Sequence, residues 1–249
     1  MTKKINIEIF YHLFIDDEWY SFSIFNEQMN TLLNSGLLHN CVSLNIGIIY
    51  CGVSEKILNK INKLIEQYNI NSNIRILYIS DSGNECNTGI FLKNYCDLLP
   101  SLISEHTYIL YFHSKGVSHF NTEKELPTKY WRHYLEYFNL IKWKNCVDKL
   151  NDGYDSCGTL WFSQKNHPIL LNSEWINSGF YAGSFFWVKS SLIQKIPLKN
   201  FTNEVFYREC MESIPSIIEH NFYSFDNTVI EGNHDLYFEI YNPKKYYTI

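Results

Sequence analysis

Short apolar segments alternate along the chain with segments in which apolar residues recur every three or four positions. The short segments are rich in β-branched and aromatic residues and predict strands over 5–11, 44–50, 74–79, 108–112 and 154–162. The helical spacing predicts helices over 22–33, 56–68, 88–103 and 130–150. Because the two kinds of segment alternate, we expect an α/β fold with a mainly parallel sheet and helices on both faces.

The chain gives no sign of more than one domain. It has 249 residues, which is enough to bury a sizeable core within one unit. It contains no internal repeat, no low-complexity tract and no change of composition typical of a linker. We therefore predict a single domain over residues 1–249.

The predicted strand 108–112 ends abruptly in the polar tetrapeptide His113-Ser114-Lys115-Gly116. Open α/β sheets bind ligands at the carboxyl ends of their strands, so these side chains are candidates for the floor of an active site. A histidine can ligate a metal or exchange protons, a lysine can neutralise a phosphate, and a glycine lets the backbone approach a ligand. The alternative is a hydrogen-bonded, partly buried His113 beside a solvated Lys115, and the tetrapeptide alone favours neither.

Two further polar groups each have a functional and a structural interpretation. Arg132, which follows Trp131, offers a planar fork for phosphate or carboxylate, but it can also pair with Glu136 one helical turn later. The polar turn 81–85 and Thr88 can contact a nucleoside, or Thr88 can lie near the cap of the next helix. Each group alone is ambiguous.

The segment 181–187, Tyr-Ala-Gly-Ser-Phe-Phe-Trp, places small residues beside large rings. Such a segment can shape a wall that contacts a ligand, and the alternative is a buried strand with bulges. Aromatic residues make up 17% of the chain. Most of these rings must lie in the core, although a sugar-binding cleft also uses rings as stacking walls.

Charge and cysteine content limit the function and the compartment. The net charge of -5 gives no electrostatic reason to expect a nucleic-acid partner. Seven cysteines without a C-x-x-C pair indicate neither a disulfide framework nor a zinc site, so we expect reduced thiols in the cytoplasm. The start Met1-Thr2-Lys3-Lys4 does not read as a signal peptide, and no apolar run is long enough for a transmembrane segment. The sequence does not indicate an oligomeric state.

The order of three separated elements resembles that of a known family. Leu110 to Gly116, then Tyr130-Trp131-Arg132, then Ala182 to Trp187 follow the pattern of rhamnan-synthesis F-type polysaccharide glycosyltransferases. Related uncharacterised proteins of bacteria and large DNA viruses share this pattern. The resemblance covers most of residues 5–205.

This resemblance implies a glycosyltransferase of the hexosyltransferase type, active in polysaccharide biosynthesis, with a GT-A-like (Rossmann-like) fold. Its co-substrate would be a nucleotide-sugar donor, and its acceptor a glycan or a lipid-linked sugar. Residues 1–116 would form the nucleotide-sugar-binding half and residues 117–249 the acceptor-side half. The alternative is a non-catalytic carbohydrate- or nucleotide-sugar-binding protein of the same fold. A metal-dependent hydrolase is a weaker rival, because the nine histidines have no metal-binding spacing.

The sequence departs from the GT-A pattern where a metal is usually held. An Asp-x-Asp motif that binds Mn²⁺ or Mg²⁺ usually ends the fourth strand of that fold, but this chain has none, and His113-Ser114-Lys115 stands there instead. Lys115, aided by Arg132, can offset the diphosphate charge in place of a metal. Alternatively, His113 is one ligand of a weaker metal site that Asp155 or the pair His234-Asp235 completes. Metal dependence therefore stays open.

The resemblance also suggests a role for each candidate residue. Those expected near the nucleoside are Asn84, Glu85 and Thr88; those facing the diphosphate are His113, Lys115 and Arg132; those forming the acceptor or sugar wall are Gly183, Ser184, Phe186 and Trp187. Inverting transfer needs a carboxylate that takes the proton of the acceptor hydroxyl. Glu204 is the preferred base, with Asp155 and Glu174 as other candidates, and for each of them the alternative is a surface carboxylate.

Overall fold

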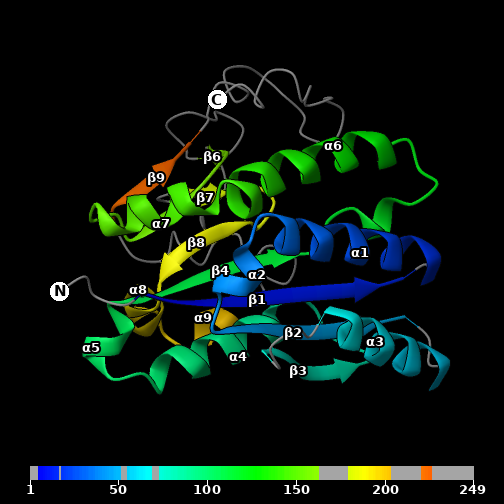
Figure 1. Ribbon diagram of the computed structural model, residues 1–249, viewed down its shortest axis with the longest axis horizontal. Coiled ribbons are helices and arrows are strands. Elements are labelled where there is room, and N and C mark those ends of the chain that lie inside the picture. The colour runs from blue at the N-terminus through cyan, green and yellow to red at the C-terminus, as the bar shows by residue number, and fades with distance from the viewer. Residues whose placement is uncertain are drawn as a thin grey trace.

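The computed structural model describes residues 5–16, 18–51, 55–68, 73–162, 179–202 and 220–225. Within these residues, a seven-stranded sheet has the strand order β3-β2-β1-β4-β8-β5-β9 (Figure 1). The strands are β1 (Asn6–Ile15), β2 (Ser43–Tyr50), β3 (Ile74–Ser80), β4 (Thr107–His113), β5 (Ser156–Gly158), β8 (Phe186–Lys189) and β9 (Phe222–Ser224). A separate antiparallel pair consists of β6 (Trp161–Phe162) and β7 (Phe180–Tyr181).

The sheet is mainly parallel, and one strand runs against the others. Strands β1 to β4 pair in parallel, as do β5 and β9, whereas β8 is antiparallel to both of its neighbours, β4 and β5. The first half of the chain thus supplies four adjacent strands, and the second half extends the same sheet beyond β4. The pairing of β4 with β8 joins the two halves in one hydrogen-bonded sheet.

Helices cover both faces of the sheet (Figure 1). One face carries α1 (Glu18–Asn34), α2 (Leu37–Asn40), α3 (Glu55–Tyr68), α6 (Glu125–Glu136), the π-helix η2 (Tyr137–Ile141) and α7 (Trp143–Asn151). The other face carries α4 (Glu85–Asp97), α8 (Ser190–Lys195) and α9 (Lys199–Thr202), and α5 (Ser101–Ser104) lies beside α8. A short 3₁₀ helix, η1 (Val117–His119), follows β4. The expected α/β class, a mainly parallel sheet with helices on both faces, is confirmed.

Strand β4 is central because it contributes to the core on both faces. Leu110 and Phe112 join the apolar cluster under α1 and α6, whereas Ile109 and Tyr111 join the cluster under α4 and α8. Alternate side chains of a strand point to opposite faces, so a strand covered on both sides reads as a continuous apolar run. This is why residues 108–112 have no polar position before His113.

Element boundaries differ from the prediction where turn geometry decides them. The predicted helix 88–103 is divided into α4 and α5 before Pro100, which cannot continue a helix. The predicted helix 130–150 begins at Glu125 and is divided by η2 and a break at Lys142. The predicted strand 154–162 is divided into β5 and β6, because Leu160 adopts a φ of 57° that interrupts a strand.

The cysteines require a correction to the expected reduced state. Cys86 is disulfide-bonded. The other cysteines of the described residues are free thiols, namely Cys41, Cys51, Cys96, Cys146 and Cys157. Disulfides are rare in the cytosol, so cysteine content no longer supports a cytoplasmic location. In the described ranges, no helix is both long and apolar enough to cross a bilayer.

The first prediction concerns Trp187, whose ring is fully buried and whose Nε1 donates a hydrogen bond to Asn139 O at 3.0 Å. Trp187→Ala should lower the free energy of unfolding by about 3–5 kcal/mol, because it leaves a large cavity in the core. The matched control is Trp19→Ala, since the Trp19 ring is 71% exposed and its loss should cost no more than about 0.5 kcal/mol. Urea unfolding of both variants measures the difference, and equal stabilities would contradict this packing.

Candidate active site

The tetrapeptide after β4 forms a turn that is tied to the end of β1. Ser114 N donates to His12 O at 3.0 Å, and Phe14 N donates to Ser114 Oγ at 2.8 Å. The Ser114 hydroxyl donates in turn to Phe14 O at 3.3 Å. Ser114 is therefore a structural residue that satisfies backbone groups where β1 and β4 end. Gly116 has a φ of +98°, which favours glycine, and it lets the chain turn away into η1.

A buried arginine holds the turn from the side of α6. Arg132 is only 1% exposed, and its Nη1 donates to Lys115 O at 3.2 Å. Its Nη2 donates to Glu27 Oε2 of α1 at 2.7 Å, and its Nε lies 3.3 Å from Glu136 Oε1. The ion pair between Arg132 and Glu136 considered from the sequence is present, and it is part of a larger network. Arg132 thus does not reach a ligand but fixes the backbone of Lys115.

A glutamine of α1 completes this buried network. Gln28 Nε2 donates to His113 O at 3.1 Å and to Glu136 Oε1 at 3.0 Å. Its Oε1 accepts a hydrogen bond from the Tyr11 hydroxyl at 2.8 Å. Burial raises the pKa of Glu136, and Arg132 acts in the opposite direction. The carbonyls of His113 and Lys115 are both held, so the tetrapeptide has little freedom to move.

The side chain of Lys115 packs against an aromatic ring. Its Nζ lies 3.5 Å from the centre of the Trp131 ring, a cation–π contact, and the residue is 7% exposed. Gly183 approaches the same ring: a Cβ there would lie 2.6 Å from Leu135 Cδ1 and 3.2 Å from Trp131 Cζ2. With its φ of +93°, this position suits only glycine. Trp131 therefore separates the lysine from the turn that contains Gly183.

His113 and Glu85 form an ion pair at the same edge of the sheet. His113 Nδ1 lies 3.0 Å from Glu85 Oε1, and its Nε2 lies 3.1 Å from Gly183 O. Both partners are oxygens, so each ring nitrogen of His113 faces a hydrogen-bond acceptor and the ring is held in place from two sides. The Tyr111 hydroxyl donates to Glu85 Oε2 at 3.2 Å. Burial acts to raise the pKa of Glu85, but His113 and, more weakly, His12 and Lys115 outweigh it and hold the pKa at about 2.

A neutral histidine lies behind this ion pair. His12 is 3% exposed, and its Nδ1 lies 2.9 Å from Thr88 Oγ1 and 3.3 Å from the Tyr78 hydroxyl. Tyr78 and Thr88 are hydrogen-bonded to each other at 2.7 Å. Burial lowers the pKa of His12 from 6.5 to about 4, with Glu85 opposing this shift and His113 adding to it. His12 is not among the site residues predicted from the sequence, because only the parallel pairing of β1 with β4 brings it beside His113.

The structure brings part of the predicted site together. Glu85, His113 and Gly183 meet at the carboxyl end of β4, whereas Lys115, whose carbonyl Arg132 holds, lies on the other side of Trp131 from Gly183. Two nucleoside candidates have structural partners instead. The Asn84 side chain accepts from Cys86 N at 2.8 Å as the N-cap of α4, and the hydroxyl of the fully buried Thr88 lies within hydrogen-bond distance of His12 and Tyr78.

Three residues of the predicted acceptor wall lie in the core. Phe186 and Trp187 are 0% exposed, on opposite faces of β8, and Ser184 is 2% exposed. Rings without exposed surface cannot stack on a sugar, so the prediction that they form the wall needs correction. They support the turn at Gly183 rather than contact a ligand.

The prediction for Asp155 also needs correction, because this residue lies near the amino end of β4, whereas His113 lies at its carboxyl end. Its Oδ1 is 3.7 Å from Lys189 Nζ, and Lys189 pairs with Tyr108 near the start of β4. Tyr108 precedes His113 by five strand positions, roughly 17 Å. Asp155 therefore cannot act as the base, or complete a metal site, beside His113. The other candidates named with it, Glu204, Glu174, His234 and Asp235, lie outside the described residues.

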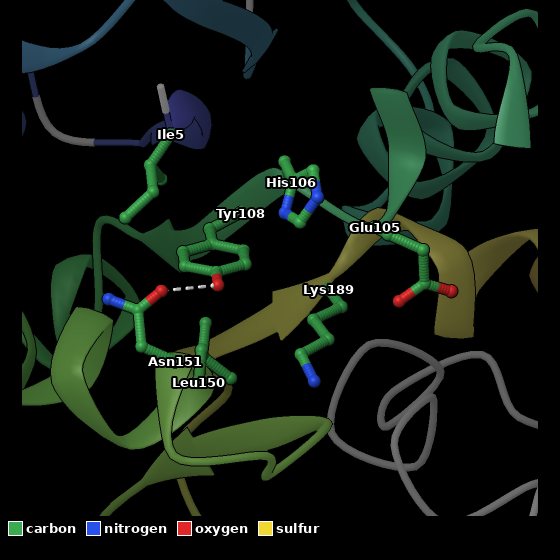
Figure 2. A pocket seen from close by; sticks show the side chains of 7 residues that line it. All are labelled: Ile5, Glu105, His106, Tyr108, Leu150, Asn151 and Lys189. Carbon is green, nitrogen blue, oxygen red and sulfur yellow. Dashed lines mark hydrogen bonds between the residues drawn. The ribbon is translucent and has the colours of Figure 1, made fainter. Parts of the chain in front are cut away.

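A cavity of about 540 Å³ also opens at this amino edge (Figure 2). Figure 2 shows His106 and Lys189 to the right of Tyr108 and Asn151 to its left, with the Tyr108 hydroxyl bonded to Asn151 Oδ1 at 2.8 Å. Its lining residues are Ile5, Glu105, His106, Tyr108, Leu150, Asn151 and Lys189. Because Tyr108 and Lys189 are engaged with Asn151 and Asp155, the cavity offers few polar groups to a ligand.

One group of metal-type ligands occurs within the described residues. Ligand atoms of Glu27, His133 and Glu136 all lie within 4.8 Å of one another. The Arg132 guanidinium contacts both of these carboxylates, and His133 Nε2 contacts Glu27. A guanidinium cation therefore already balances the negative charge between the carboxylates. This group belongs to the network that supports Lys115.

Comparison with known proteins gives one family and several distant structural neighbours, two of which are described below. A family described as a domain of unknown function (DUF8361) matches residues 10–181. No curated protein matches the chain. The glycosyltransferase GlyE of Streptococcus pneumoniae TIGR4 is 11% identical with a TM-score of 0.33, and the match covers 90% of this chain and 46% of that one. The mannosyltransferase Ktr4p of S. cerevisiae is 8% identical with a TM-score of 0.27, over 82% of this chain and 62% of that one.

This chain thus spans less than two thirds of either neighbour. Both TM-scores are below 0.5, so neither likeness decides the function. The chemistry of the site has to be inferred from its own residues.

The second prediction concerns His12, whose pKa is depressed in the folded state. Between about pH 6.5 and pH 4 the unfolded chain binds a proton at His12 that the folded chain does not, so stability falls as the pH falls through this window. The loss attributable to His12 is at most about 3 kcal/mol. His12→Gln should therefore flatten the dependence of the free energy of unfolding on pH.

Urea unfolding at several pH values across this window tests the prediction. His119→Gln is the control, because His119 is half-exposed and its pKa is lowered in the same direction. The same pH dependence in the His12→Gln variant and the wild type would contradict a buried, neutral His12.

Proposed function

The chain belongs to the DUF8361 family, and we propose that it is a glycosyltransferase that moves a sugar from a nucleotide-sugar donor to a glycan or lipid-linked acceptor. The observation that carries this proposal is the Lys115 ammonium, fixed against the Trp131 ring at the carboxyl end of β4 in the same turn as His113. That edge is where open α/β sheets bind nucleotides. The resemblance to rhamnan-synthesis F-type enzymes agrees with the proposal and stays a prediction.

The charge at this edge suits a diphosphate. Lys115 contributes one positive charge, the carboxylate of Glu85 is paired with His113, and His12 is neutral at pH 7. One positive charge remains to stabilise the negative charge that develops on the departing nucleoside diphosphate. Because Arg132 and Gln28 hold the backbone of the turn, little reorganisation is needed when that charge develops.

The donor atoms at the end of β4 do not fit a divalent cation. Both nitrogens of His113 already have oxygen partners, and Lys115 brings a positive charge where a metal ligand should be neutral or negative. A carboxylate pair or an oxygen cluster, which Mg²⁺ and Mn²⁺ prefer, is absent from the described residues of this turn. We infer that Lys115 supplies the charge stabilisation that a metal supplies in other enzymes of the GT-A type.

Transfer would then proceed as follows. An oxygen of the acceptor hydroxyl attacks the anomeric carbon, and the bond from that carbon to the diphosphate oxygen breaks with its electron pair on the diphosphate. The hydroxyl proton goes to a base. Glu85 is a weak base because its pKa is about 2, and its carboxylate is engaged with His113 and Tyr111. Glu204, outside the described residues, therefore remains the predicted base.

Release of free nucleoside diphosphate distinguishes a glycosyltransferase from the non-catalytic alternative. The purified protein is incubated with a panel of nucleotide sugars, and free nucleoside diphosphate is measured with and without a glycan acceptor. A glycosyltransferase releases the diphosphate from at least one donor. Release from none of them would contradict the proposal and favour a carbohydrate- or nucleotide-sugar-binding protein.

The third prediction tests Lys115 directly. Lys115→Ala should lower the turnover number by about 100-fold or more, because it removes the charge that stabilises the leaving group. The matched control is Lys144→Ala, since Lys144 Nζ also lies over a tryptophan ring, 5.6 Å from the centre of Trp143, but in α7 rather than at the carboxyl edge. Thermal unfolding verifies that both variants fold. Wild-type turnover in a folded Lys115→Ala variant would rule out its assigned role.

A further inference from the structure

We propose that Trp19 and Phe120 form a stacking platform for a sugar ring of the acceptor glycan. This inference rests on the proposed function, because it places the acceptor beside the proposed diphosphate site. It also replaces the buried rings of Phe186 and Trp187 as the aromatic contact for a sugar.

Trp19 is exposed to a degree unusual for this protein. Its side chain is 71% exposed, whereas the other described tryptophans, Trp131, Trp143, Trp161 and Trp187, are at most 7% exposed. Leaving a ring of this size in water forgoes the free energy that burial would give, typically about 2–3 kcal/mol for a large apolar side chain. An exposed indole next to a second ring is the surface that carbohydrate-binding sites use against the apolar face of a pyranose.

A small apolar cluster supports the Phe120 side of the platform. The Phe120 ring is stacked on that of Tyr20, with centroids 4.6 Å apart, and the Trp19 ring lies 6.2 Å from it at an interplanar angle of 50°. Tyr20, Ile24 and Val117 form a buried cluster against which Phe120 packs. A preformed aromatic surface loses little conformational entropy when a ligand binds.

The platform borders the proposed diphosphate site. Phe120 follows η1, which starts directly after the turn that carries Lys115, and His119 N donates to Gly116 O at 3.0 Å within this connection. Trp19 lies in the first turn of α1, which starts just beyond the carboxyl end of β1. Both rings therefore lie at the carboxyl edge of the sheet, on segments that adjoin the turn with Lys115.

The polar surroundings favour a neutral sugar over other partners of an aromatic surface. Three carboxylates, Glu18, Glu123 and Glu125, adjoin the rings in sequence, together with Lys124, and Glu18 pairs with Lys60 at 2.9 Å. Carboxylates accept hydrogen bonds from sugar hydroxyls. The same carboxylates oppose stacking by the bases of a nucleic acid and attachment to an anionic bilayer, because both of these partners carry negative charge.

Binding of defined oligosaccharides tests this inference without any donor. Maltopentaose, cellopentaose, chitopentaose and mannopentaose are titrated calorimetrically into the wild type, Trp19→Ala, Trp19→Phe and Leu102→Ala. Leu102 is the control, because it is 76% exposed on α5, away from the carboxyl edge. At least one pentasaccharide should bind the wild type, and Trp19→Ala should weaken it by about tenfold or more.

Trp19→Phe should retain most of the affinity, and Leu102→Ala should retain all of it. Equal affinity in Trp19→Ala, or no binding of any pentasaccharide to the wild type, overturns the platform. If no pentasaccharide binds while a donor is turned over, the platform fails and the proposed function stands. If binding depends on Trp19 while no donor is turned over, the platform stands as a glycan-binding surface and the glycosyltransferase proposal fails.

Discussion

The buried guanidinium of Arg132 is the interaction on which the arrangement of the site depends. It joins α6 to α1 through Glu27 and to the turn after β4 through the carbonyl of Lys115. A buried charge is tolerated only when it is paired and hydrogen-bonded, and breaking a buried pair typically costs about 3–5 kcal/mol. The network therefore constrains the sequence at several positions, although none of its members needs to touch a ligand.

Because of this constraint, some residues at the carboxyl edge support the backbone and others present their side chains. Arg132 and Gln28 hold the backbone, so the side chains of Lys115 and His113 are free of that supporting task. His113 is held between Glu85 and the carbonyl of Gly183, whereas His12 behind it is kept neutral by burial. The ammonium of Lys115 is therefore fixed in place before a ligand binds. A preorganised charge of this kind is what catalysis of phosphate departure requires.

The sequence predicted the features that depend on neighbouring residues and missed those that depend on distant ones. Strand β4 and the polar turn at its end were recognisable, because both follow from a continuous apolar run and its abrupt end. The partners of that turn are not recognisable from the sequence, because Gln28 is 85 residues from His113 and Glu27 is 105 residues from Arg132. The segment 181–187 was assigned to a ligand wall because aromatic residues suit a wall and a core equally, and only the antiparallel pairing of β8 decides between them.

The central claim is that the fixed ammonium group of Lys115, rather than a divalent metal ion, stabilises the charge of the diphosphate. Calorimetric titration of UDP, GDP, ADP, CDP and dTDP into the wild-type protein in EDTA, and again in Mn²⁺, tests it most directly. At least one nucleoside diphosphate should bind in EDTA, with an affinity within a few-fold of that in Mn²⁺. Binding that occurs only in Mn²⁺, or no binding of any of the five, would contradict the claim.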